Sequence, residues 1–205
     1  MTLDNFLEIL HETAELQAFG IITPENPNGK DVSDKKNIEL KEKFEEFCLN
    51  HGIIYHEIGG KFAGINESSY MVENINYEDL EGIAEDFNQF SFIHGVRDPK
   101  KTKEPVVYKK GDTKYIFRYY EKQNSSYQQV DETSYIMVDH TLSDNYSFFK
   151  DQPSKRWSVR FFQSFNPEES NYEHPYEHEE LEEGVKKSTI KKIREVINPR
   201  YRRLN

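Results

Sequence analysis

The spacing of apolar residues predicts alternating helices and strands over the first hundred positions. Residues 4–17 repeat apolar side chains every three or four positions, as an amphipathic helix does. Two further helical repeats cover 33–50 and 76–87, and short apolar strands are predicted at 18–23, 53–58, 70–72 and 90–94. Ser33 and Asn76 precede the two later helices as N-caps. After the first helix the order is β-α-β-β-α-β, so we expect an α+β fold with a ferredoxin-like, split βαβ core.

The pattern changes beyond Arg97, where apolar and polar residues begin to alternate. This alternation predicts strands at 105–109, 113–121, 135–139 and 157–165, and residues 122–133 are polar, with no strand predicted there. In the first half, Gly59-Gly60 is expected to stop a strand. We therefore expect three segments: an α/β core domain over 1–97, an antiparallel β extension of the same sheet over 98–165, and an acidic loop with a basic C-terminal helix over 166–205.

Polar residues gather where the predicted strand 18–23 ends. The following segment, Thr23-Pro-Glu-Asn-Pro-Asn-Gly29, is typical of a rigid polar loop, and a helix begins at Ser33. In a split βαβ sheet the first strand lies between the third and the fourth. Residues that are far apart in the sequence should then meet at one edge of the sheet: Thr23, Asn26, Asn37, Glu67, Ser68 and Gln89.

These residue types allow two interpretations. In the first they form a pocket, with Glu67 as a general base or a partner for a cation and the other five as ligand-binding residues. The start of the helix, with Lys30, Lys35 and Lys36 nearby, favours a small anionic ligand such as a nucleotide or a phosphorylated or amino-acid-like metabolite. In the second interpretation, the same side chains only cap and brace the loop 24–32.

The same positions carry a resemblance to a known family. Phe19-Gly-Ile-Ile-Thr-Pro-Glu-Asn-Pro27 is followed by Asn37, Gly60, Glu67-Ser-Ser69 and Phe87-Asn-Gln89. This order resembles domain of unknown function 3293, an uncharacterised family of bacteria and phages, over about residues 1–95. The sequence departs from the family at Asn88, where glycine is usual. The resemblance implies no known activity, so neither an enzymatic reaction nor a cofactor follows from it.

Composition and charge narrow the class of protein. The chain of 205 residues is 35% hydrophobic, carries a net charge of −10 and has no run of about 18 apolar residues. We expect a cytoplasmic protein with no membrane segment, and the negative charge makes nucleic acid an unlikely partner. Cys48 is the one cysteine, so an internal disulfide is impossible, and its helical neighbours indicate an inert core thiol.

The C-terminal part offers weaker candidate sites. His174 and His178 are four residues apart, but Pro175 interrupts the helix that a zinc site would need, so no metal site is predicted. The basic run 186–203 could contact nucleic acid, or it could be neutralised by the acidic block before it. As an alternative function, we consider a non-catalytic interaction module that a phage would encode and that would bind a host protein through residues 98–205.

Overall fold

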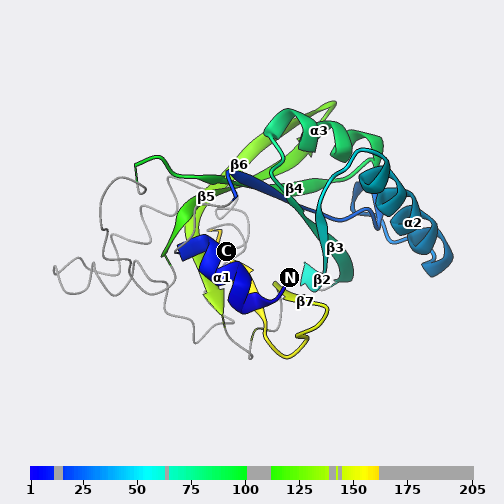
Figure 1. Cartoon of the computed structure of the whole chain (residues 1–205). Helices are drawn as coiled ribbons and strands as arrows, with labels where there is room; N and C mark the ends of the chain where they lie inside the picture. Colours follow the sequence, from blue (N-terminus) through cyan, green and yellow to red (C-terminus); the bar gives the residue numbers. More distant parts are fainter. Residues whose placement is uncertain (12–15, 63–64, 101–111, 139–141, 143–144, 162–205) are drawn as a thin grey trace, which may run out of the picture. The chain divides into compact units, whose positions relative to one another are not determined.

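In the computed structural model of the chain, the described residues form one closed barrel of eight antiparallel strands (Figure 1). The structure describes residues 1–11, 16–62, 65–100, 112–138, 142 and 145–161, all within the first of two units of the chain, Met1–Phe161. The strands are β1 Ala18–Ile22, β2 Tyr55–Phe62, β3 Ile65–Glu73, β4 Ser91–Arg97, β5 Asp112–Gln123, β6 Ser126–Val138, β7 Tyr146–Phe149 and β8 Trp157–Val159. Around the barrel their order is β1-β3-β2-β7-β8-β6-β5-β4.

The predicted ferredoxin-like class is wrong. Four strands do follow the order β4-β1-β3-β2, with β1 antiparallel to both β3 and β4. In an open split βαβ sheet β4 and β2 would be edges, whereas here β4 pairs with β5 and β2 pairs with β7. The strands after residue 111 therefore close the wall, and closure pairs both edges. The domain boundaries expected at 97 and 165 stay predictions, and the C-terminal helix lies outside the described residues.

Several predicted strands have different bounds. β2 runs through Gly59 and Gly60 instead of stopping there, because the Phe148 ring of β7 covers the position that a Cβ of residue 59 would take. β6 includes most of the polar stretch 122–133, for which no strand was predicted, since its exposed face is polar while Tyr127 and Thr133 are buried. β7 was not predicted, β8 ends at Val159, and the strand predicted at 105–109 lies outside the described residues.

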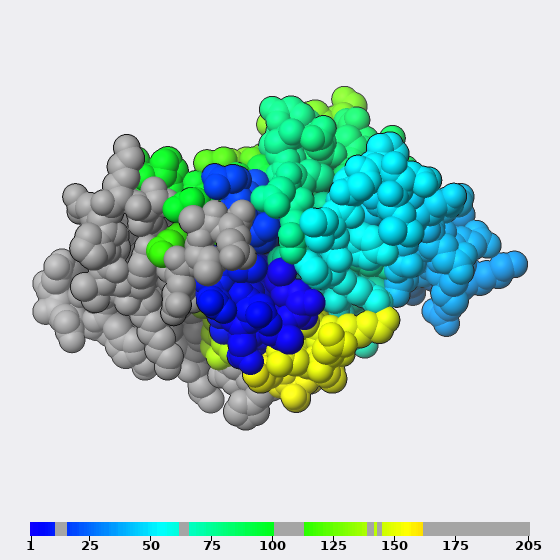
Figure 2. All heavy atoms as spheres, viewed as in Figure 1, coloured from blue at the N-terminus to red at the C-terminus, as the bar shows by residue number. Residues whose placement is uncertain are grey.

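The barrel interior is filled mainly by aromatic and aliphatic side chains. Helix α1, Leu3–His11, contributes Leu3, Phe6 and Leu10 to this core. The Phe6 ring lies 5.6 Å from that of Phe19 and 5.0 Å from that of Trp157. Figure 2 shows the opposite side of α1 at the surface, beside the segment near residue 150. There the backbone N–H of Leu3 donates to Gln152 Oε1 at 2.8 Å, so α1 packs as part of the barrel core.

A second core lies between the barrel wall and helices α2, Asp34–Asn50, and α3, Tyr77–Asp86 (Figure 1). Both helices begin at the predicted caps: Ser33 Oγ accepts from Lys36 N, and Asn76 Oδ1 accepts from Asp79 N. Cys48 is buried in this layer, and burial raises the pKa of its thiol to about 11. None of the described helices has the length and apolar content needed to cross a membrane.

Candidate functional site

Side chains of the loop after β1 continue the ladder between β1 and β3. The backbone pairing of β1 with β3 ends at Ile22 and Tyr70. Beyond it, Thr23 Oγ1 donates to the carbonyl of Ser68 at 2.7 Å, and Glu25 Oε2 accepts from the backbone N–H of Ser68 at 3.0 Å. Thr23 Oγ1 also accepts from Glu25 N at 3.1 Å. These bonds hold the loop against the start of β3.

Asn26 is the centre of the polar contacts in this loop. It has left-handed backbone angles, φ 50° and ψ 60°, which asparagine tolerates better than most residues, and its surface is only 4% exposed. Its backbone N–H donates to Asn37 Oδ1, and Asn37 Nδ2 donates to Asn26 Oδ1, both at 3.1 Å. Asn37 lies in the first turn of α2, so one residue of the helix is bonded to two atoms of Asn26.

Asn26 in turn holds the carboxylate of Glu67. Its Nδ2 donates to Glu67 Oε1 at 3.2 Å. Burial raises the pKa of Glu67, the hydrogen bond from Asn26 lowers it, and the nearby charge of Glu25 raises it, with a net shift upward. Among the described residues, neither glutamate belongs to an ion pair. Glu67 is therefore a half-buried carboxylate with an amide donor and no described cation.

The side chain of Glu67 belongs to the interior face of the barrel wall. Side chains two residues apart share a face of a strand, and Met71 of the same strand lies in the interior core. Tyr119 of β5, which is 8% exposed, also belongs to this core, and its ring lies 5.5 Å from that of Phe161. Burial raises the pKa of Tyr119, a hydrogen bond with Ser91 lowers it, and the charges of Glu121 and Glu67 raise it.

The structure thus brings five of the six predicted residues together: Thr23, Asn26, Asn37, Glu67 and Ser68. Gln89 is buried, but its Nε2 donates to the carbonyl of Phe87 in its own loop. That loop meets the turn after Asn26 through a backbone bond from Asn28 N to Asn88 O at 2.8 Å. Gln89 therefore borders the group without a described bond to it.

Sequence reasoning missed Glu25, Ser91 and Tyr119. Glu25 stands between the two noted residues Thr23 and Asn26, so its place in the loop was a usable signal. Tyr119 is a buried aromatic residue of β5, and nothing in the sequence indicates that the charge of Glu67 raises its pKa. The hydrogen bond between Tyr119 and Ser91 depends on β4 and β5 being neighbours, which the sequence pattern does not reveal.

The features expected to favour an anion are not part of the described contacts of Glu67. Lys30, Lys35 and Lys36 are all exposed, and Lys36 pairs with Glu39 at 3.4 Å. In the described ranges, no three histidine, cysteine or acidic residues are grouped so that they could hold a metal ion. His174 and His178 lie outside those ranges. The chemistry at Glu67 is that of a carboxylate, amides and hydroxyls.

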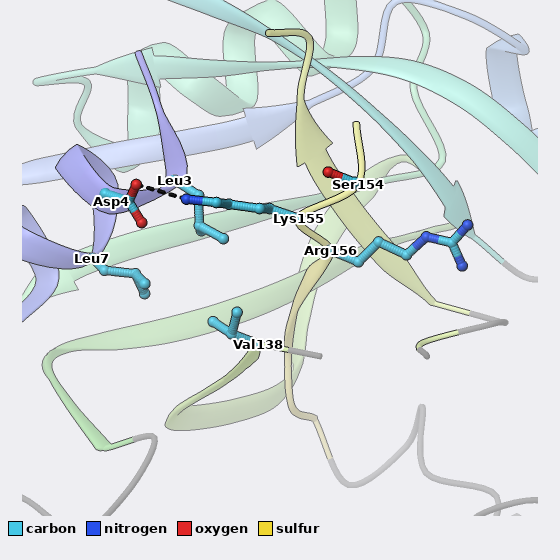
Figure 3. A pocket seen from close by; sticks show the side chains of 7 residues that line it. All are labelled: Leu3, Asp4, Leu7, Val138, Ser154, Lys155 and Arg156. Atoms are coloured by element: carbon cyan, nitrogen blue, oxygen red, sulfur yellow. Dashed lines mark hydrogen bonds and ion pairs between the residues drawn. The ribbon is translucent and has the colours of Figure 1, made fainter. Parts of the chain in front are cut away.

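A groove lies away from Glu67, between α1 and the residues before β8 (Figure 3). Leu3, Leu7 and Val138 form its apolar floor, and an ion pair between Lys155 and Asp4 crosses its edge at 2.7 Å. The guanidinium of Arg156 donates to the carbonyl of Leu142 and stacks over the Tyr146 ring. This groove holds no convergent reactive groups, so we place the candidate site at Glu67.

Comparison with known proteins confirms the family resemblance. Residues 22–91 match the family described as Protein of unknown function (DUF3293). The match runs from the last residue of β1 to the first residue of β4 and includes all six predicted site residues. No curated protein and no solved structure matches the chain.

Proposed function

We propose that the protein binds a small polar ligand at the end of the barrel where Glu67 faces the interior. The observation that carries this proposal is the desolvated carboxylate of Glu67, held by Asn26 and without a described cation. Burying a carboxylate without a cation destabilises a fold, and such groups are frequent at functional sites. Further polar groups for a ligand are the Glu25 carboxylate, whose charge raises the pKa of Glu67, and the Tyr119 hydroxyl, whose own pKa the charge of Glu67 raises.

The ligand's charge follows from these groups. Two carboxylates disfavour an anionic group directly at Glu67 and favour an ammonium or another N–H donor there. Within the anionic class predicted from the sequence, an amino-acid-like metabolite meets this condition because it carries both charges. Its ammonium group would contact Glu67, and its anionic group would remain toward solvent, where the lysines at the start of α2 are exposed.

An upward shift in pKa also suits proton transfer, because a carboxyl group with a raised pKa can hold a proton nearer neutral pH. Glu67 would be the group that moves the proton if the bound ligand is also a substrate. The proposal is therefore ligand binding, and a catalytic role would use the same carboxylate.

The experiment is calorimetric titration of the full chain with three kinds of probe: amino acids, amines without an acid group, and nucleotides or sugar phosphates. We expect binding of an amine-bearing probe by the wild type and at least a tenfold loss in Glu67→Gln, which keeps an acceptor for Asn26 but removes the charge. Glu42→Gln, at an exposed position of α2, is the matched control and should bind like the wild type.

Binding of phosphates alone, unaffected by Glu67→Gln, would contradict the proposal. If no probe binds and a protein partner is instead captured through residues 98–205, the alternative of an interaction module replaces it.

A further inference from the structure

We propose that Asn37 is a positioning residue, which acts through Asn26 to fix the carboxylate of Glu67 for its ligand. This inference rests on the proposed function, because it assigns to Asn26 and Asn37, two of the predicted ligand-binding residues, the role of orienting the Glu67 carboxylate. Three elements contribute one residue each: α2 supplies Asn37, the loop after β1 supplies Asn26, and β3 supplies Glu67.

The hydrogen bonds leave one possible orientation for the Asn26 amide. Its Oδ1 is surrounded by two donors, Asn37 Nδ2 at 3.1 Å and the backbone N–H of Val32 at 3.3 Å. A flipped amide would point its NH₂ at both donors and its oxygen at a carboxylate, which leaves every contact repulsive. The donors on one side of Asn26 therefore oblige its NH₂ to face Glu67.

Asn37 fixes the backbone of Asn26 as well as its side chain. Its Oδ1 accepts from Asn26 N at 3.1 Å. The side-chain amide of Asn37 therefore bonds to both the backbone N–H and the side-chain oxygen of Asn26. Asn37 is itself held, since its backbone N–H donates to the carbonyl of Ser33 at 3.0 Å in the first helical turn. The rigid start of α2 thus sets the direction in which Asn26 presents its donor.

Bracing of the loop alone does not account for this arrangement. A glycine at position 26 would take the left-handed backbone without strain and would keep the bond from its N–H to Asn37. The Asn26 Oδ1 braces Val32 and Asn37, but its Nδ2 contributes to neither of those bonds. The NH₂ group donates to Glu67. Because Asn26 donates to Oε1, a ligand would bond to the other oxygen of the Glu67 carboxylate.

The test follows the titration of the Glu67 carboxyl by carbon-13 NMR in the full chain, without any ligand. Asn37→Ala removes both bonds to Asn26, and Asn26→Gly removes the donor to Glu67 while it relieves the backbone. In both variants we expect the titration midpoint of Glu67 to move to higher pH, because the ionised carboxylate loses its donor while Glu25 and Tyr119 remain. Asn50→Ala, at the exposed end of α2, is the control and should leave the midpoint unchanged.

A purely structural role predicts a different result: lower stability with an unchanged Glu67 midpoint, and that result would overturn the proposal. Asn26→Gly guards against a variant that fails to fold, since glycine suits the left-handed backbone. The outcome is separable from the proposed function. If the titration midpoint of Glu67 moves but no probe binds to the wild type, the positioning of Glu67 by Asn37 through Asn26 is supported and the ligand proposal fails.

Discussion

Glu67 is the central carboxylate of the candidate site, and its ionisation at neutral pH lowers the stability of the fold. Its folded-state pKa is raised, chiefly by burial, so the folded protein holds the proton more tightly than the unfolded chain does. Stability from this group is therefore complete at low pH and is lost as pH rises through the folded pKa. A residue that lowers the stability of the fold when its own carboxyl group is ionised is typical of a functional position.

Glu67→Gln should accordingly raise the melting temperature at pH 7.5, by roughly 1–3 °C, because the neutral amide removes the buried charge and still accepts from Asn26. At pH 4 the gain should shrink, since the wild-type carboxyl is then protonated more fully. Thermal unfolding at both pH values checks this, with Glu42→Gln as the exposed control. An equal or larger gain at pH 4 would contradict the sign of the effect.

His94 changes the stability of the fold with pH in the opposite direction to Glu67. It is 4% exposed beneath α3, its Nε2 lies 3.0 Å from the carbonyl of Ile75, and its Nδ1 is buried without a hydrogen-bond partner among the described residues. Burial lowers the pKa of His94, the bond to Ile75 raises it, the opposing Arg118 lowers it and Glu78 raises it, with a net shift downward. A second proton would sit on Nδ1, for which the described part of the chain supplies no acceptor.

Stability should therefore fall as pH drops below about 6.5, where the unfolded histidine begins to take up a proton that folded His94 refuses. His94→Gln should flatten this part of the curve, although it lowers stability at pH 7.5 through lost packing. Urea unfolding from pH 7.5 to 5 measures both effects. His51→Gln, at the exposed end of α2, is the control, and a slope as steep in His94→Gln as in this control would refute the assignment.

At the scale of elements, the sequence was sufficient to predict features set by neighbouring residues, such as helix starts. It was not sufficient to predict the pairing of strands that are far apart in the chain. The caps Ser33 and Asn76 define α2 and α3 through bonds to residues three positions later, so the sequence alone located both helix starts. β2 passes through Gly59 because a ring from β7, almost ninety residues later, covers it. No pattern near Gly59 contains that information. The candidate site could be predicted because it depends on the pairing of β1 with β3. These two strands are neighbours in the predicted split βαβ sheet and also in the observed barrel.

The contact between β1 and α3 gives a prediction at this scale. A Cβ on Gly20 would lie 2.6 Å from Cδ1 and 2.8 Å from Cδ2 of Leu80, a fully buried residue of α3. Gly20→Ala should then lower the free energy of unfolding by about 1–3 kcal/mol through overpacking. Gly82→Ala, on α3 itself with open space around it, should instead raise it by about 0.5–1 kcal/mol. Chemical denaturation of the two variants tests the pair, and equal signs would disprove the packing argument.

For the whole molecule, the interior explains why the sheet closes. An eight-stranded barrel has an interior just wide enough for side chains to fill. Here the inward residues of the wall, such as Phe19, Phe117 and Phe149, are joined by Phe6 and Leu10 of α1. The first helix was predicted only as an amphipathic element. Its partner surface exists only once β7 and β8 complete the wall, so the helix and the closure depend on one another.

Phe6→Ala should therefore destabilise the barrel as a unit. The Phe6 ring is fully buried against Phe19, Phe149 and Trp157, and such a truncation costs about 3–5 kcal/mol. We expect one cooperative transition at lower denaturant, with hydrogen-exchange protection falling together in α1, β1 and β8. Leu7→Ala, at the half-buried edge of the same helix, should cost clearly less. If protection fell in α1 alone while β1 and β8 kept theirs, the helix would be an attachment to a barrel that is stable without it, and the mutual dependence argued above would be wrong.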